Sequence, residues 1–357
     1  MGKTKNKKIG IYSPYLDISG GGERYILSIA EYLSQENEVY LFWPESDSLK
    51  NSAKITLNIS LDRIHFVSNE IFSSKNLFNT LKSLFTFDIF FHMTDGSVFL
   101  SPARKNFLII QSPAHCPEKN ITNILKLLKW RVLCYSDFVA DIIKKRLGTS
   151  AIVLPPPVDV EKEPELAKEN NILSVGRFFT GLHNKKQDIL LEEFIDGAKS
   201  VYKGVTLTFA GGLTEESGKT YLESLREKAK NFSVDFQVNM AYKDLMTLYE
   251  KAKVYWHAAG FGENLELNPE RAEHFGITTV EAMCHGCLPI VFNAGGQREI
   301  IQDKEDGYLW TTTRELREKT NIILTNEEKR LIMAQKARQK ARNYSKVSFY
   351  EKLDALL

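Results

Sequence analysis

Short apolar segments alternate with amphipathic ones along most of the chain, and this alternation restricts the fold more than any other feature. Strand-like runs stand at 8–13, 38–43, 88–93, 106–112 and 132–136, and a second series follows at 171–178, 205–212, 234–240, 254–259 and 288–293. Strands that alternate with helices form βαβ units around a parallel sheet. The sequence therefore predicts an α/β protein with two Rossmann-like parallel sheets.

Three consecutive prolines, Pro155 to Pro157, separate the two series. Proline cannot continue a helix or a central strand, so 151–165 is expected to be a stiff extended connector. The 357 residues also favour two domains, since one domain usually holds about 100–200 residues. We predict domains at 1–154 and 155–342, and a final short helix in 343–357.

The composition argues against several classes of protein. The 47 Lys and Arg nearly balance the 45 Asp and Glu, whereas a general nucleic-acid binder has a basic excess. The 4 cysteines are too few for a disulfide framework, which favours a reducing compartment and a cytoplasmic location. The stretch Cys284 to Cys287 is C-x-x-C without a second pair, so a zinc or redox role is disfavoured.

The segment 119–132 is basic, amphipathic and carries a tryptophan. This composition is typical of a helix on an anionic membrane surface, and an ordinary surface helix with snorkelling lysines fits it as well. No apolar run reaches the roughly 18 residues of a membrane span. Any membrane contact is therefore expected to be peripheral, on the inner face of the membrane.

Two loops that follow predicted strands could bind a phosphorylated ligand. The glycines of SGGGERY (19–25) open a helix and let backbone amides approach an anion, although a tight turn alone explains them too. In SVGRFFTGLHNKKQD (174–188), Arg177, Lys185 and Lys186 would suit a diphosphate. Ordinary surface basic residues are the alternative for that loop.

Two acids, Glu273 and Glu281, stand eight positions apart around Gly276 and a helix expected to begin near Ile277 or Thr278. The amides of a helix start attract anions, and ionised carboxylates accept hydrogen bonds from sugar hydroxyls. An anion site beside two such acceptors indicates a nucleotide sugar. The alternative is a surface Glu281 and a Glu273 that merely stabilises the helix dipole.

Taken in order, these motifs resemble family 4 glycosyltransferases of the GT-B fold. The resemblance rests on GGGERY, SVGRF with KKQD, the E-x7-E stretch EHFGITTVEAM, and the later GGQREII and DGYLW, and it covers nearly the whole chain. It is nearest to bacterial polysaccharide transferases with WHA, GFG and EHFGITTVEAM, which are similar to a eukaryotic lipid-linked-oligosaccharide mannosyltransferase. It implies two domains facing across a cleft, with the C-terminal helix packing back on the first.

The resemblance also implies roles for residues. Glu281 would hold the ribose hydroxyls and Glu273 the donor sugar, while Arg177 and Lys186 would neutralise the diphosphate leaving group. The loop residues that would meet sugar and phosphate are Phe275, Gly276, Ile277 and Thr278, with Gly21 and Gly22 closing from the other domain. The implied chemistry is retaining; the sequence contains no D-x-D, so no metal and no cofactor are expected.

The chain departs from this pattern after the strand at 106–112. Many relatives place a histidine there, whereas this sequence has Gln111, with His115 four residues later. A glutamine can bond a hydroxyl but cannot act as a base near neutral pH. Gln111 and His115 therefore remain candidates for sugar or acceptor contacts, with a structural His115 favoured.

We predict a retaining, metal-independent hexosyltransferase in cell-surface polysaccharide synthesis. The resemblance makes GDP-mannose the first guess for the donor and a glycan or lipid-linked molecule the acceptor. Three alternatives stay open: a nucleotide-sugar 2-epimerase, a pyridoxal-phosphate-dependent phosphorylase of the same fold, and a non-catalytic GT-B scaffold in a glycan-assembly complex.

Overall fold

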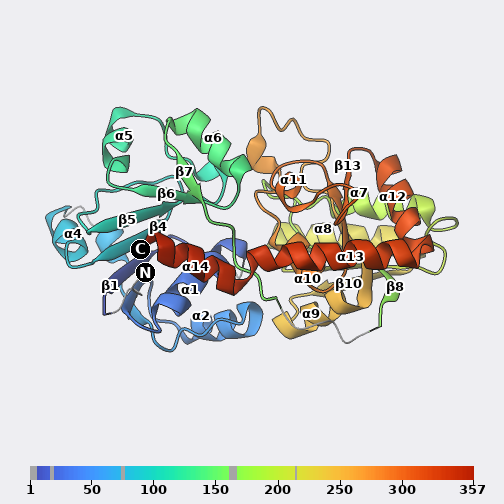
Figure 1. The fold of residues 1–357 in the computed structure, drawn as a ribbon, viewed down its shortest axis with the longest axis horizontal. Coiled ribbons are helices and arrows are strands. Elements are labelled where there is room, and N and C mark those ends of the chain that lie inside the picture. Colours follow the sequence, from blue (N-terminus) through green and yellow to red (C-terminus); the bar gives the residue numbers. More distant parts are fainter. Residues whose placement is uncertain (1–5, 17–19, 74–76, 161–166, 214) are drawn as a thin grey trace. The chain divides into compact units, whose positions relative to one another are not determined.

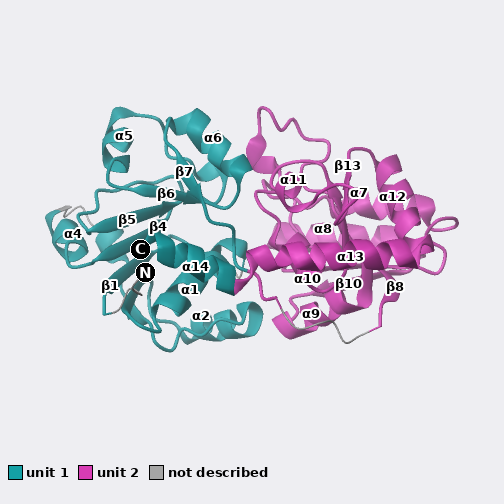
Figure 2. Ribbon diagram, viewed as in Figure 1, with its two compact units in different colours: residues 1–157, 347–357 teal, residues 158–346 magenta. Residues whose placement is uncertain are grey.

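The structure is a computed structural model that describes residues 6–16, 20–73, 77–160, 167–213 and 215–357. The chain divides into two compact units (Figure 2). Unit 1 comprises Met1–Pro157 and Val347–Leu357, and unit 2 comprises Val158–Lys346. The chain thus passes between the units twice. The two passages lie close together in unit 2, where the Val158 amide donates to the Tyr344 carbonyl at 2.9 Å.

Unit 1 is built on a seven-stranded parallel sheet in the order β3-β2-β1-β4-β5-β6-β7; Figure 1 labels β1 and β4 to β7. Its strands are β1 (Lys8–Tyr12), β2 (Glu38–Phe42), β3 (His65–Val67), β4 (Ile89–Met93), β5 (Lys105–Ile109), β6 (Arg131–Cys134) and β7 (Ala151–Val153). Every residue of β4 is buried, as expected of a parallel sheet covered on both faces. The predicted parallel sheet is confirmed.

The helices of unit 1 begin and end on local signals. The Ser136 hydroxyl accepts from the Val139 amide at 3.3 Å to start α6 (Asp137–Leu147), and Gly148, with φ 74°, ends it. The others are α1 (Gly21–Leu33), α2 (Asp47–Ser52), the π-helical turn Ala53–Leu57, α3 (Glu70–Ser73), α4 (Leu77–Leu84), the 3₁₀ turn Pro113–His115 and α5 (Ile121–Leu127).

The prediction for residues 119–132 is wrong in its second half. Only α5 is helical, and the segment enters strand β6 at Arg131. Trp130 is not on the surface: it is 6% exposed and its Nε1–H donates to the Phe99 carbonyl at 3.0 Å. The Trp130 ring packs edge-on against Phe90 and Phe99, and this burial outweighs the amphipathic pattern.

Unit 2 has a six-stranded parallel sheet in the order β10-β9-β8-β11-β12-β13. Its strands are β8 (Glu169–Val175), β9 (Thr206–Gly211), β10 (Val234–Val238), β11 (Ala252–His257), β12 (Leu288–Phe292) and β13 (Tyr308–Trp310). The five predicted strands of the second series correspond to β8 to β12. Trp256 on β11 is fully buried, and its indole N–H donates to Thr320 Oγ1 at 2.9 Å.

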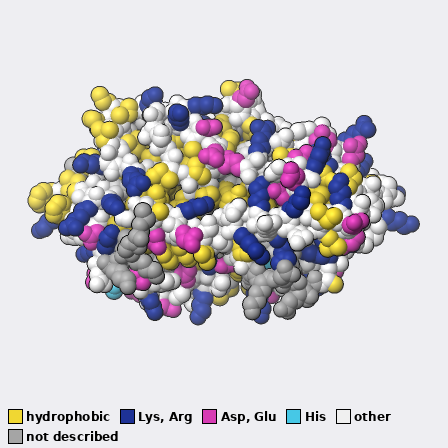
Figure 3. Space-filling view, viewed as in Figure 1, with side chains coloured by type: hydrophobic (Ala, Val, Ile, Leu, Met, Phe, Trp, Pro, Cys, Tyr) yellow, Lys and Arg dark blue, Asp and Glu magenta, His cyan; other side chains and the backbone are white. Residues whose placement is uncertain are grey.

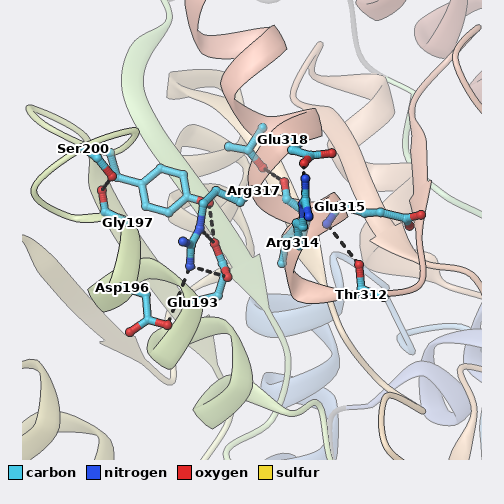
Figure 4. A network of polar contacts seen from close by, with 12 residues as sticks. Glu193, Asp196, Gly197, Ser200, Thr312, Arg314, Glu315, Arg317 and Glu318 are labelled. Atoms are coloured by element: carbon cyan, nitrogen blue, oxygen red, sulfur yellow. Dashed lines mark hydrogen bonds and ion pairs between the residues drawn. The ribbon is translucent and has the colours of Figure 1, made fainter.

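The helices of unit 2 are held to one another by polar as well as apolar contacts. Arg317 of α12 donates twice to the buried Glu193 of α7, at 2.6 and 2.9 Å, and Tyr202 donates to the same carboxylate (Figure 4). The helices are α7 (Gln187–Gly197), α8 (Glu216–Ala229), α9 (Tyr242–Lys251), the 3₁₀ turn Pro269–Arg271, α10 (Ile277–Cys284), α11 (Gln297–Ile300), α12 (Thr313–Thr325) and α13 (Glu327–Ala341).

The chain ends with the predicted break and a last helix. The 3₁₀ turn Arg342–Tyr344 separates α13 from α14 (Lys346–Leu356). Although α14 follows unit 2, it belongs to unit 1 (Figure 2). The rings of Tyr32 and Tyr350 stack with centroids 3.9 Å apart, and the ring of Phe349 meets that of Tyr25. The helix therefore returns to the first unit, as predicted.

Candidate functional site

The sheet of unit 2 changes direction between two neighbouring strands. Strand β9 lies on one side of β8, and β12 lies on the other side of β11. The loops that leave the carboxyl ends of β8 and β11 therefore diverge, and ligands of open parallel sheets bind at such a switch point. These loops are 176–186 and 258–276, which contain most of the predicted site residues of this unit.

Helix α10 begins at Ile277, where the sequence predicts it. The preceding Gly276 has φ 121°, and a Cβ atom there would lie 2.9 Å from Gln297 Nε2, so a larger residue does not fit. The first amides of a helix have no acceptor within it. This turn therefore presents N–H groups and the positive end of a helix dipole beside the loop that carries Glu273.

The GGQREII motif packs against the loop that carries Glu273. The Gly296 amide donates to the Glu273 carbonyl at 2.8 Å. A Cβ atom on Gly295, whose φ is 57°, would lie 2.2 Å from the same oxygen. Gln297 Nε2 donates to Thr279 Oγ1 at 2.9 Å. The motif thus fixes both the backbone of Glu273 and the first turn of α10.

Glu273 is the charged centre of the site. Lys185 Nζ lies 2.5 Å from Glu273 Oε2, and His257 Nε2 lies 2.8 Å from the same oxygen. The carboxylate side chain is 15% exposed. Burial alone would raise its pKa, but Lys185 and His257 outweigh that effect and hold the pKa of Glu273 well below its usual value. The group is therefore ionised at neutral pH.

The two adjacent lysines have different partners. Lys185, which the resemblance does not single out, contacts Glu273, whereas Lys186 Nζ binds Glu263 Oε1 at 2.5 Å. Arg271 lies 3.3 Å from the other oxygen of Glu263. Lys186 has φ 55° at the start of α7, so its side chain leaves the backbone differently from that of Lys185. The structure thus brings Lys185, and not Lys186, to Glu273.

Arg177 is the cation of the loop that keeps a free charge. No carboxylate in the described part of the chain pairs with its guanidinium, which lies 5.8 Å from the Phe179 ring. The backbone around it is fixed, because Gln187 Nε2 donates to the carbonyls of Gly176 and Arg177 at 3.2 and 3.1 Å. An Arg fork held in this way suits a phosphate group.

Glu281 lies inside the unit, so the alternative that it is a surface residue is wrong. It is 2% exposed, and Tyr249 donates to Glu281 Oε2 at 3.0 Å. Burial, followed by the neighbouring carboxylate, raises the pKa of Tyr249 well above its usual value, so its hydroxyl keeps the proton it donates. The carboxylate is thus held in a fixed orientation one turn inside α10.

The remaining predicted residues of this loop differ in access. Phe275 is buried, with its ring 5.3 Å from that of Tyr344, so only its backbone is left for a ligand. Ile277 and Thr278 are half-buried, and Thr278 Oγ1 lies 2.7 Å from the Tyr255 hydroxyl.

Sequence reasoning gave two histidines of this region no specific role. His257 ends β11 and contacts Glu273, and its position at the carboxyl end of a strand was the signal that could have found it. His183 lies in the loop after β8, with its ring 5.4 Å from that of His274. Burial and nearby positive charges lower the pKa of His183 to about 3, so it is neutral at physiological pH.

In unit 1, the predicted residues Gly22, Gln111 and His115 lie in one cluster. A Cβ atom on Gly22 would lie 2.3 Å from Gln111 Oε1, so a larger residue would displace the Gln111 amide from its present position. Gln111 Nε2 donates to the Tyr15 hydroxyl at 3.1 Å, and His115 Nδ1 lies 3.1 Å from the same hydroxyl. Tyr15 is thus the residue that joins them, and no sequence motif points to it. Gly21 is the first residue of α1.

The C-x-x-C cysteines are structural. Cys284 and Cys287 are unpaired and buried, and burial raises the pKa of each thiol to about 12. Within the described ranges, no three His, Cys, Asp or Glu side chains gather as metal ligands would. The same ranges contain no helix that is long and apolar enough to span a membrane.

Comparison of the sequence with known proteins identifies its family. The sequence model of the family "Glycosyl transferases group 1" matches residues 157–340, just over half of the chain. The chain therefore belongs to the group 1 glycosyltransferases. The matched segment contains Arg177, Lys185, Glu273 and Glu281.

Two relatives from Dictyostelium discoideum are each 26% identical. One is a GDP-Man:Man(3)GlcNAc(2)-PP-Dol alpha-1,2-mannosyltransferase, matched over 79% of this chain and 52% of its own length. The other, alpha-1,3/1,6-mannosyltransferase ALG2, is matched over 87% of both chains. The chain thus spans about half the length of the first relative.

A solved structure confirms the fold. Anabaena Alr3699/HepE, crystallised in complex with UDP and glucose, matches 98% of this chain and 99% of its own with a TM-score of 0.74 and 18% identity. The fold is therefore GT-B, as the motifs predicted.

Proposed function

We propose that this glycosyltransferase moves mannose from GDP-mannose to a lipid-linked glycan, with retention of configuration and without a divalent metal. The observation that carries the proposal is the loop pair at the switch point of unit 2. There Arg177, which pairs with no carboxylate among the described residues, lies in the same loop as Lys185, whose ammonium is bound to Glu273. A fixed guanidinium stabilises a departing diphosphate, and an ionised carboxylate accepts from sugar hydroxyls.

The choice of donor rests on the names of the relatives. Both Dictyostelium relatives are named as mannosyltransferases, and one name specifies GDP-Man. The Anabaena structure, which is less similar in sequence, contains UDP and glucose. Mannose and guanosine are therefore our first choice, and uridine with glucose is the alternative to be tested beside it.

The chemistry follows from which charges are already paired. Lys185 and Lys186 each face a carboxylate, so Arg177 and the first amides of α10 supply the uncompensated positive field. In the proposed reaction that field stabilises the nucleoside diphosphate as the bond to the sugar breaks. The acceptor hydroxyl then attacks from the face that the diphosphate leaves and passes its proton to the departing phosphate oxygen, which retains the configuration at the anomeric carbon.

The first experiment measures donor binding and turnover with a chelator present. Wild type and Arg177→Ala are followed by thermal shift against GDP-mannose, UDP-glucose, GDP and UDP, since a ligand stabilises by mass action. We expect GDP and GDP-mannose to raise the melting temperature of the wild type alone. We also expect the wild type to transfer mannose to a short-chain polyprenyl-diphosphate oligosaccharide. Binding that needs added Mg²⁺ would reject the metal-independent mechanism. Conversion of donor without acceptor would identify the epimerase instead.

We further propose that unit 1 lies on a membrane through α5, α4 and the residue that follows α4. Ile121 and Leu128 are 77% and 76% exposed, Leu125 is exposed between them, and Phe78 and Phe85 are exposed on and after α4. Figure 3 shows hydrophobic side chains with Lys and Arg beside them where Figure 1 places these helices. Exposed apolar side chains flanked by lysines bind anionic lipid surfaces.

Vesicle binding tests this contact. Wild type is expected to float with phosphatidylcholine vesicles that contain phosphatidylglycerol, and to bind less to phosphatidylcholine alone. The variant with Ile121, Leu125 and Leu128 changed to Ser should remain in solution. The matched control changes Leu331 and Ile332 of α13, which are similarly exposed, and should float like wild type. Equal flotation of both variants would reject α5 as the contact.

A further inference from the structure

We infer that His257 is a positioning residue which, together with Lys185, occupies one oxygen of Glu273 and leaves the other for the donor sugar. The inference rests on the proposed function, because it takes the ligand of Glu273 to be a nucleotide sugar. The motif WHA contains His257, but neither the motifs nor the relatives give this residue a role.

The contacts of the Glu273 carboxylate are one-sided. Lys185 Nζ and His257 Nε2 both bind Oε2, at 2.5 and 2.8 Å. In the part of the chain that the structure describes, no side chain or amide bonds Oε1. The carboxylate therefore keeps one oxygen with acceptor capacity, in a loop whose backbone is fixed by Gly295 and Gly296.

The proton on the His257 ring follows from its surroundings. The ring is 2% exposed, and burial lowers the pKa of His257 although Glu273 opposes this. A neutral imidazole can donate to an ionised carboxylate only if Nε2 carries the hydrogen. Nδ1 is then a bare acceptor, and it is buried without a partner among the described residues. Glu273 is thus the polar contact that this ring makes there.

The histidine does what the lysine cannot. A lysine ammonium is a point charge with rotating donors on a flexible stem, so it attracts the carboxylate without fixing its orientation. An imidazole has two side-chain torsions and one N–H direction, and His257 stands at the end of the buried strand β11. The ring therefore sets the rotation of the carboxylate, and misplacement of a reactive contact by about 1 Å can cost about a hundredfold in rate.

Two substitutions separate positioning from general damage. In His257→Gln the amide nitrogen can take the place of Nε2, whereas in His257→Asn it can reach only the place of Nδ1. We expect the Gln variant to keep GDP-mannose affinity and kcat/KM within about threefold, and the Asn variant to lose about tenfold or more in both. Free GDP does not reach Glu273 through a sugar, so its Kd should change less than about twofold in either variant.

Three results would overturn the inference. The first is a His257→Asn variant that binds GDP-mannose as tightly as wild type, and the second is an equal loss of GDP-mannose affinity in His257→Gln and His257→Asn. The third is a loss of affinity for free GDP that parallels the loss for GDP-mannose. A second measurement does not need the donor. Long-range ¹H–¹⁵N spectra of histidine-labelled wild type should show His257 as the Nε2–H tautomer at neutral pH, and the Nδ1–H tautomer would reject the contact. A wild type that binds no nucleotide sugar, yet shows the Nε2–H tautomer, would refute the proposed function and leave the positioning contact intact.

Discussion

The polar groups gathered in unit 1 and in unit 2 differ in charge. In unit 1, Tyr15, Gln111 and His115 are joined by hydrogen bonds, and burial lowers the pKa of His115 so that the ring is neutral. In unit 2, Arg177 and two lysines share the site loops with Glu263 and Glu273. Both units have the same parallel architecture, so the loops alone create this difference. Neutral donors and acceptors suit the hydroxyls of a glycan, whereas charges suit a diphosphate.

The largest effect is expected from the unpaired cation of unit 2. Arg177→Ala should lower kcat by about a hundredfold or more, since a preorganised donor to a leaving group contributes on that scale. The melting temperature without ligand should stay near that of wild type, because the guanidinium has no carboxylate partner among the described residues. Steady-state kinetics and a thermal melt check both parts. A rate within threefold of wild type would break the assignment of the diphosphate to unit 2.

The second prediction distinguishes charges that build the fold from charges that act in the site. Arg317→Ala leaves Glu193 buried, with Tyr202 as its one remaining side-chain donor among the described residues. Loss of one partner of a buried pair costs about 3–5 kcal/mol. Arg317 is partly exposed, so we expect a smaller loss of about 2 kcal/mol in the free energy of unfolding, measured by urea denaturation.

The matched control for this prediction lies on the same helix. Arg314, three residues earlier, pairs with Glu318 on the surface of α12 (Figure 4), and Arg314→Ala should change the free energy of unfolding by less than about 0.5 kcal/mol. Equal stabilities of the two variants would show that the Glu193 pair does not hold α7 to α12. GDP affinity of correctly folded Arg317→Ala should match wild type.

The sequence predicts the fold better than the site because they depend on different information. Alternating strands and helices suffice for two parallel sheets, and Gly276 marks the start of α10. Trp130 was misplaced because amphipathic spacing near a strand does not reveal which side chain the sheet buries. Glu281 contacts Tyr249, which lies 32 positions away. This contact depends on the tertiary structure, so the spacing of residues in the sequence cannot predict it.

The lysine pair shows the same limit at single-residue scale. Lys185 and Lys186 are chemically identical and adjacent, so composition and motif order do not distinguish them. The left-handed backbone at Lys186 does, because it points one side chain to Glu263 and leaves the other at Glu273. Such a conformation is uncommon for a residue with a Cβ atom.

These neighbours therefore form a matched pair for the third prediction. Lys185→Met should lower kcat/KM by about tenfold, because it removes the cation that binds Glu273. Lys186→Met should cost about threefold or less, since its ammonium is already committed to Glu263. Kinetics with GDP-mannose decide between them. The reverse order would support the diphosphate role that the resemblance gives to Lys186 and would make the Glu263 contact one that the donor displaces.

The smallest effect should come from unit 1 and should appear in a different constant. Tyr15→Phe removes the hydroxyl that accepts from Gln111 and lies beside His115. One neutral hydrogen bond contributes about 0.5–1.5 kcal/mol, so we expect the KM for the acceptor to rise about threefold to tenfold while the Kd of GDP stays unchanged. Tyr32→Phe, whose hydroxyl bonds Asp354 elsewhere in unit 1, should leave both constants unchanged. If Tyr15→Phe weakens GDP instead, the neutral cluster serves the donor, and the division of labour between the two units is lost.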